Sequence, residues 1–170
     1  MSSKMRQFRL LIAFSLSFAV KTSALAQNQR GYLQAFNYLQ KNHKGKQLVT
    51  VDTLIQANFS SFYKELSKDW KQRPSTTIKI LDSLDYSSKE YFKAVVTLVR
   101  LNVTGTKPEY LIYFSSIKKH LLVAEIITRK AGYSLAYNEQ TYFNHGERYL
   151  FVLDRHLRIK SIYKKVIQYN

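Results

Sequence analysis

Glu125 is the residue of this sequence whose surroundings most demand a chemical explanation. It lies in the run LLVAEII, residues 121–127, which is otherwise entirely apolar. In a β-strand alternate residues share a face, so Glu125 is expected on the same face as Val123 and Ile127. An ionised carboxylate without a partner is costly in such a place. We therefore expect Glu125 to reach solvent, to meet a cation or to take up a proton.

Arg100 poses the mirror-image problem, because it follows Val96 and Leu98 on one face of another predicted strand. A cross-strand pair between Glu125 and Arg100 would satisfy both charges, and we favour this structural interpretation. The alternative places Glu125 at the mouth of a cavity as a ligand contact or a general base, because carboxylates with shifted proton affinity gather at functional sites. In that case Arg100, Tyr113 and Tyr149 are the other ligand-binding candidates.

Six tyrosines of the C-terminal half could line such a pocket, namely Tyr110, Tyr113, Tyr133, Tyr137, Tyr142 and Tyr149. Tyrosine also suits a strand, because its ring is apolar and its hydroxyl tolerates partial exposure. We expect most of these side chains in the core or on the sheet surface.

Sequence signatures of several catalytic classes are missing. There is no P-loop, no G-x-G-x-x-G, no G-x-S-x-G and no H-E-x-x-H motif. The chain has no cysteine, which excludes a thiolate nucleophile, an iron–sulfur cluster and a cysteine-based zinc site. The histidines are far apart in sequence, and we predict neither a metal site nor a cofactor. Asp82 and Asp85 form a D-x-x-D that could divide acid and base roles, but the serines around them favour a turn-forming loop.

The N-terminal segment has the layout of a secretory signal peptide. Lys4, Arg6 and Arg9 precede the apolar run 10–20, and Ala24-Leu25-Ala26 follows it. The run is shorter than the roughly 20 residues that a membrane-spanning helix needs. We predict that residues 1–26 are cleaved and that residues 27–170 form a single domain. A lipoprotein is excluded for lack of cysteine, and we expect a periplasmic or extracellular location.

Charge points to the class of partner. The chain carries a net charge of +16, which falls to about +12 without the four basic residues of the predicted signal. Basic residues cluster in three segments, 41–46, 118–120 and 155–165. One interpretation is a solvated, lysine-rich surface without a specific partner. The other is attraction to an anionic partner, an envelope polymer or a membrane surface, because a positive field attracts negative charge. Nucleic acid is disfavoured because no nucleic-acid-binding motif is present.

Periodicity predicts helices first and strands afterwards. One amphipathic helix is expected over 28–41. A second is expected to begin at an Asp52 or Thr53 cap and to end before Pro74. Strands are predicted at 48–51, 77–81 and 91–104, followed by a turn at 104–108. Two hairpins are then predicted, 109–115 with 120–129 and 148–154 with 157–168, joined by a long connection over 130–146. A bulge is expected near Lys160–Ser161.

This order predicts an α+β fold in which two N-terminal helices pack on a curved antiparallel sheet of about five to six strands. The order of elements, ending in the hairpin RYLFVLDRHLRIKSIY, resembles the NTF2-like roll of small exported bacterial proteins, and cystatin-like proteins share a related order. The resemblance implies a sheet curled into a cone that can hold a ligand or an active site. It carries no catalytic residue over to this chain.

The sequence therefore favours an exported, non-enzymatic binding or interaction domain that contacts an anionic envelope component or a small ligand. One alternative is an enzyme that uses the cone interior with Glu125 as its acid or base. Another is a structural or inhibitor-like module.

Overall fold

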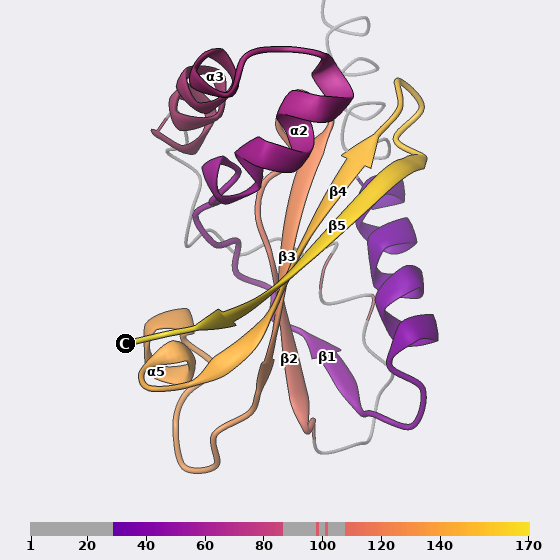
Figure 1. Ribbon diagram of the computed structural model, residues 1–170. Coiled ribbons are helices and arrows are strands. Elements are labelled where there is room, and N and C mark those ends of the chain that lie inside the picture. The colour runs from indigo at the N-terminus through magenta and orange to yellow at the C-terminus, as the bar shows by residue number, and fades with distance from the viewer. Residues whose placement is uncertain (1–28, 87–97, 99–100, 102–107) are drawn as a thin grey trace, which may run out of the picture.

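The computed structural model describes residues 29–86, 98, 101 and 108–170 of the chain (Figure 1). The predicted signal segment 1–26 lies outside these ranges, and so does Arg100. A helix over 29–42 comes first, and no helix of the described ranges is long and apolar enough to cross a membrane. The remaining elements are β1 (Leu48–Thr50), the 3-10 turn η1 (Ser60–Phe62), α2 (Tyr63–Trp70), α3 (Pro74–Tyr86), β2 (Tyr110–Phe114), β3 (Leu121–Thr128), α5 (Tyr137–Thr141), β4 (His145–Leu153) and β5 (Ile159–Gln168). The fold is α+β, as predicted.

The described strands form one five-stranded sheet in the order β1-β2-β3-β4-β5. Both predicted hairpins are confirmed, since β2 pairs with β3 and β4 pairs with β5 in antiparallel fashion. The predicted bulge is confirmed as well, because Leu153 pairs with Ile159 and Val152 with Ser161, which leaves Lys160 as the extra residue. The sheet is not purely antiparallel, however. β1 pairs with β2 in parallel, because the chain crosses over through α2 and α3 before it returns to the sheet.

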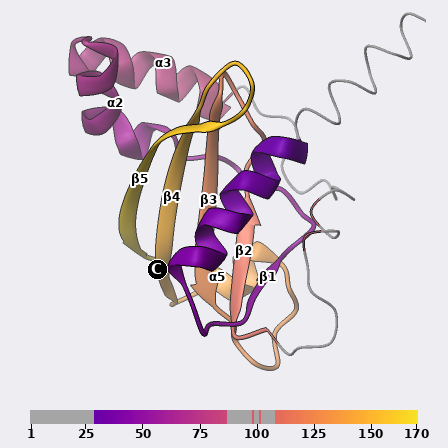
Figure 2. The same ribbon diagram turned by 90° about the vertical axis from the view of Figure 1, so that its right-hand side faces the viewer.

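Helical segments cover both faces of this sheet (Figure 2). Leu122, Ala124 and Ile126 of β3 pack in one cluster with Phe36 and Leu39 of the helix over 29–42. The alternate residues Leu121 and Val123 pack in a second cluster on the opposite face, with Leu66 of α2 and Leu81 and Leu84 of α3. Strand β3 is buried on both sides for this reason, and an unbroken apolar run is the sequence expected of it.

The helix predicted over 28–41 is observed over 29–42, although Leu33 is exposed rather than packed. The second predicted helix begins much later than expected, and neither Asp52 nor Thr53 caps it. Residues 51–55 instead follow the sheet, because the amides of Val51 and Ile55 donate to the carbonyl oxygens of Ile112 and Phe114 in β2. Helix α2 ends at Trp70, ahead of Pro74 as predicted.

The strand predicted over 77–81 is wrong, because this stretch lies inside α3. Pro74 opens the helix at a position where its missing N–H costs nothing. The buried residues Thr77, Leu81, Leu84 and Asp85 follow helical spacing. The loop predicted around Asp82 and Asp85 is therefore also wrong.

Two further predictions have mixed outcomes. The strand predicted over 91–104 and the turn over 104–108 lie almost wholly outside the described residues. Leu98, which is described, is buried and helical rather than extended. The connection over 130–146 contains the short helix α5, and β4 already begins at His145.

Candidate ligand-binding site

Glu125 lies on the face of the sheet that is covered by α2 and α3, as its spacing from Val123 predicted. Only 1% of the surface of Glu125 is exposed to solvent. The strand register places Tyr113 of β2 on one side of it and Arg148 of β4 on the other. The cation that meets Glu125 is thus Arg148. Arg100, the predicted partner, lies outside the described residues.

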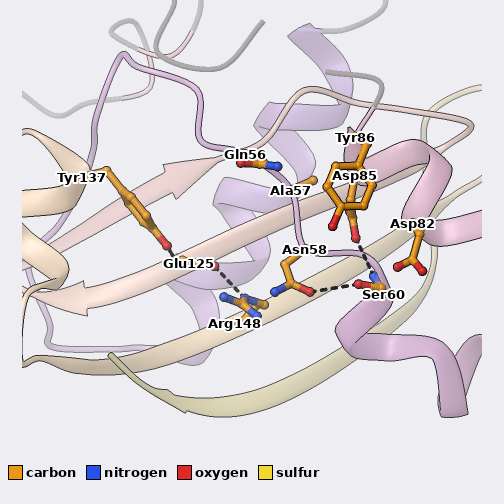
Figure 3. Close-up of a pocket in the computed structure, with 10 residues that line it drawn as sticks. All are labelled: Gln56, Ala57, Asn58, Ser60, Asp82, Asp85, Tyr86, Glu125, Tyr137 and Arg148. Atoms are coloured by element: carbon orange, nitrogen blue, oxygen red, sulfur yellow. Dashed lines mark hydrogen bonds and ion pairs between the residues drawn. The ribbon is translucent and has the colours of Figure 1, made fainter. Parts of the chain in front are cut away.

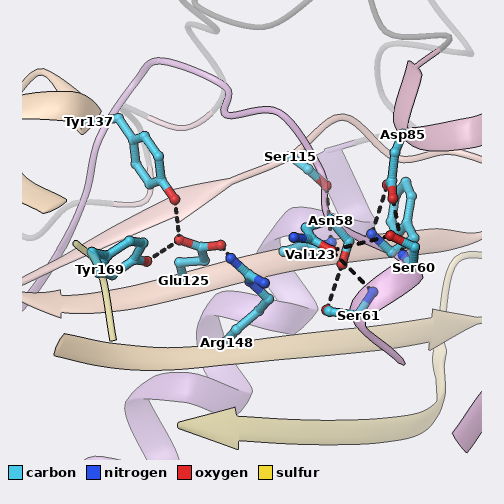
Figure 4. A network of polar contacts seen from close by, with 11 residues as sticks. Asn58, Ser60, Ser61, Asp85, Ser115, Val123, Glu125, Tyr137, Arg148 and Tyr169 are labelled. Carbon is cyan, nitrogen blue, oxygen red and sulfur yellow. Dashed lines mark hydrogen bonds and ion pairs between the residues drawn. The ribbon is translucent and has the colours of Figure 1, made fainter. Parts of the chain in front are cut away.

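Both carboxylate oxygens of Glu125 accept hydrogen bonds (Figure 4). Arg148 Nε donates to Oε1 at 2.6 Å. The hydroxyl of Tyr137 donates to Oε2 at 2.6 Å, and the hydroxyl of Tyr169 donates to the same oxygen. Charge-assisted bonds of this kind are about twice as strong as neutral ones, so the group fixes the position of the Arg148 side chain.

The hydrogen bonds and the burial around Glu125 shift the pKa values of its tyrosine and arginine partners. Burial raises the pKa of Tyr137 and Tyr169, and the negative charge of Glu125 raises it further, so both hydroxyls keep their protons and act as donors. Burial works against the charge of Arg148, but the attraction of Glu125 outweighs it and raises the pKa of the guanidinium.

The two tyrosines come from segments far from β3 in sequence. Tyr137 opens α5, and Tyr169 follows the end of β5, where its amide donates to the carbonyl of Asn144. The rings of Tyr113 and Tyr137 meet edge to face at 5.2 Å, and those of Tyr137 and Tyr169 at 6.1 Å. The fully buried Tyr113 hydroxyl donates to Leu135 O at 3.0 Å, so Tyr113 supports Tyr137 rather than Glu125.

A cavity of about 370 Å³ opens beside this group (Figure 3). Glu125, Arg148 and Tyr137 line one side of it, and the side chains of α3 line the other. The segment 56–60, which leads into η1, runs between the two sides. Asp85 holds this segment in place, because its oxygens accept from the amides of Phe59 at 2.7 Å and Ser60 at 3.0 Å. The cavity lining is Gln56, Ala57, Asn58, Ser60, Asp82, Asp85, Tyr86, Glu125, Tyr137 and Arg148.

A second polar group surrounds Glu147 on the opposite face of the sheet. Glu147 accepts from Tyr149 at 2.6 Å, from Lys164 at 2.7 Å and from His43 at 2.9 Å. Its partial burial works against the charged form, but these hydrogen bonds prevail and lower its pKa from 4.5 to about 2. Tyr149, a predicted site residue, therefore belongs to this group and not to that of Glu125. A smaller cavity of about 200 Å³ lies beside it.

Two of the three basic segments meet at one end of the sheet. The turn between β2 and β3 approaches the tip of the β4–β5 hairpin, where Leu153 N–H donates to His120 O at 2.8 Å. The start of the helix over 29–42 lies at the same end, since Gly31 is next to Ile117 and Leu157. We call this surface the basic end and define it by Arg30, Lys118, Lys119, Arg155, Arg158 and Lys160.

The basic end contains little negative charge of its own. Asp154 is the only acidic residue in the three stretches that build it, 29–42, 115–120 and 153–165, and it is paired with Arg158 at 2.8 Å. Arg30, Lys119, Arg155 and Lys160 are exposed. The third basic segment, 41–46, lies at the other end of the helix over 29–42.

Sequence reasoning missed Arg148, although its signal was of the same kind as that of Glu125. Arg148 alternates with the apolar residues Leu150 and Val152 in β4, so it was a charged residue on an apolar strand face. Tyr169 and Asp85 carried no such signal, because their contacts depend on how distant segments pack.

Arg148 is more available to a ligand in the cavity than Glu125 is. Glu125 is almost fully buried and both its oxygens are engaged, which suits a residue that orients a guanidinium better than one that exchanges protons with a ligand. Within the described ranges no three His, Asp or Glu side chains gather as metal ligands. No model of a known protein family, no curated protein and no solved structure matches the chain.

Proposed function

We propose that this chain is an exported binding domain whose basic end attaches it to a membrane surface rich in anionic lipid headgroups. The observation that carries the proposal is the meeting of two basic segments, distant in sequence, at one end of the sheet with a single acidic residue among them. The predicted signal peptide supports an envelope location. For the architecture we retain the NTF2-like roll as a proposal, supported by the cavity between the sheet and α3.

Electrostatics makes such an attachment feasible. Each basic residue near an anionic membrane contributes about 1 kcal/mol, and a cluster of four to eight is typical of lipid-binding surfaces. The basic end supplies four exposed residues without an acidic partner among the described residues, namely Arg30, Lys119, Arg155 and Lys160, which reaches the lower bound of that range. The tip of the β4–β5 hairpin lies at one end of the strands, and α2 and α3 lie at the same end of the sheet (Figure 1).

Vesicle co-sedimentation tests the proposal directly. The purified protein should sediment with vesicles that contain phosphatidylglycerol and stay in solution with pure phosphatidylcholine vesicles. Binding should fall steeply with added salt, because exposed charges are screened over about 10 Å at 0.1 M ionic strength. Binding to a soluble polyanion such as heparin with none to vesicles would reject the membrane as the partner.

A pair of charge-matched variants localises the effect. The triple variant Arg30→Gln, Lys119→Gln, Arg155→Gln should lose most of the vesicle binding. The control Lys41→Gln, Lys44→Gln, Lys68→Gln removes the same charge from exposed positions elsewhere and should retain it. Equal losses in both variants would mean that only net charge matters, and the basic end would then have no special role.

A further inference from the structure

We infer that the cavity between α3 and the sheet is a binding site for a small zwitterion, an amino carboxylic acid whose carboxylate pairs with Arg148 and whose ammonium group pairs with Asp82. The cavity shares no residue with the basic end, and its ligand would be a small molecule instead of a membrane surface. Ligand binding can therefore fail or succeed independently of membrane attachment.

Arg148 supplies the anion-binding side. Its Nε is held by Glu125 at 2.6 Å, while its side chain is still 14% exposed and lines the cavity. No described residue accepts from its two Nη atoms. A guanidinium held by one edge keeps N–H donors on its remaining edges, and their planar geometry matches a carboxylate. The pairing with Glu125 thus orients the guanidinium for a ligand.

Asn58 adds a second donor on this side. Its Oδ1 accepts from the amide of Ser61 at 3.0 Å, which fixes the orientation of the side-chain amide. The Nδ2 atom then points toward Arg148 (Figure 3). A carboxylate between Arg148 and Asn58 would accept from both.

Asp82 supplies the cation-binding side. It lies on the cavity wall formed by α3, is only partly buried, and neither accepts a hydrogen bond nor forms an ion pair within the part of the chain that is described. Its neighbour Asp85 is already engaged by two backbone amides. In a chain of net charge +16, an acidic residue on a cavity wall that has no basic partner among the described residues is a favourable place for a ligand ammonium.

The dimensions of the cavity limit the ligand. A volume of about 370 Å³ is near the lower end of the range for small-molecule sites, which is roughly 300–1,000 Å³. It accommodates a metabolite-sized molecule with opposite charges at its two ends. Gln56 and Ser60 offer further hydrogen bonds along its length.

Calorimetric titration with linear amino carboxylic acids tests the site. The probes run from glycine to 6-aminohexanoate, so that they cover a range of separations between the carboxylate and the ammonium group. We expect measurable binding with an optimum at one chain length. At that length the dicarboxylate and the diamine should bind about tenfold or more weakly, because each leaves one charged residue of the protein facing a like charge. If no probe binds, or if all lengths and charge types bind alike, the inference is wrong.

Two variants assign the roles. Arg148→Lys keeps a positive charge for Glu125 but removes the planar donors, and it should weaken every carboxylate probe about tenfold or more. Asp82→Asn should abolish the preference for the amino acid over the plain carboxylate of equal length and leave the plain carboxylate unaffected. Asp52→Asn, which changes a carboxyl outside the cavity lining, is the control and should bind like the unaltered protein. Unaltered binding in either of the first two variants would overturn the corresponding contact. Vesicle binding by Asp82→Asn should be unaffected.

Discussion

Glu125 and Glu147 lie on adjacent strands of one sheet, and each accepts hydrogen bonds from tyrosine and from a cation, yet their surroundings differ. Glu125 faces α3 and α5 with a side chain that is 1% exposed, and its cation is an arginine that is 14% exposed. Glu147 lies on the opposite face with a side chain that is 29% exposed, and its main cation is a lysine that is 47% exposed.

The group around Glu125 fixes the position of the Arg148 side chain, whereas the group around Glu147 is partly exposed to water. Water can take the place of the exposed Lys164 at Glu147, so that bond contributes little to stability. Water compensates much less at Glu125, which is almost fully buried, and a buried charge without a partner is expensive. Mutations of matching chemistry in the two groups should therefore have effects of different size, which we give from the largest to the smallest.

Arg148→Ala should produce the largest effect. It leaves the buried Glu125 carboxylate without its cation, and breaking a buried pair in this way costs about 3–5 kcal/mol. We expect a loss of that size in the free energy of unfolding, measured by urea denaturation. The matched variant Arg158→Ala removes an arginine that is 60% exposed and paired with Asp154, and its loss should be much smaller. Equal losses would show that Glu125 is not isolated from water.

Tyr169→Phe should come next. It deletes one of the two hydroxyls that donate to Oε2 of Glu125, while Tyr137 continues to donate. Hydrogen bonds to buried charged groups contribute about 1.5–3 kcal/mol, and we expect a loss within that range. Tyr163→Phe is the comparison, because the Tyr163 hydroxyl donates to Asp69 at an exposed position. Its unfolding free energy should change by less than about 1 kcal/mol.

The position of Glu125 was predictable from the sequence, and its partners were not. Alternate residues of a strand share a face, so Glu125 lies on the face of Val123 and Ile127 however the strand pairs. The hairpins were predictable for a similar reason, because their pairing is local. Which cation lies opposite Glu125 depends on the register between β3 and β4, which are separated by the long connection over 130–146.

Helix α3 shows where local reasoning failed. The segment TTIKIL, residues 76–81, is rich in β-branched residues and alternates, which favours a strand. Tertiary packing overrode this preference, because Leu81 and Leu84 join the second core cluster and Thr77 is buried with them only at helical spacing. The consequence for the site was large. With α3 assigned as a strand and loop, neither the cavity wall at Asp82 nor the contact of Asp85 with the segment 56–60 could be foreseen.

Glu147→Gln should have a moderate effect that depends on pH. Because the pKa of Glu147 is lowered in the folded protein from 4.5 to about 2, its ionised form stabilises the fold above about pH 4.5, and this stability is lost as the pH falls toward 2. The contribution is modest, since the side chain is partly exposed to water. We expect Glu147→Gln to be less stable than the unaltered protein at pH 6 and to approach it near pH 2. A constant difference across thermal melts at these pH values would contradict this.

Lys164→Gln should have the smallest effect. Lys164 Nζ donates to Glu147 Oε1 at 2.7 Å, but Tyr149 and His43 still donate to the other oxygen after the change. An exposed pair of this kind contributes about 0–1 kcal/mol and is screened by salt. We therefore expect a small loss of stability at low ionic strength that disappears at high ionic strength. The loss caused by Arg148→Ala should persist at high ionic strength, because its carboxylate is buried. If the two losses respond to salt in the same way, burial does not distinguish the two carboxylates.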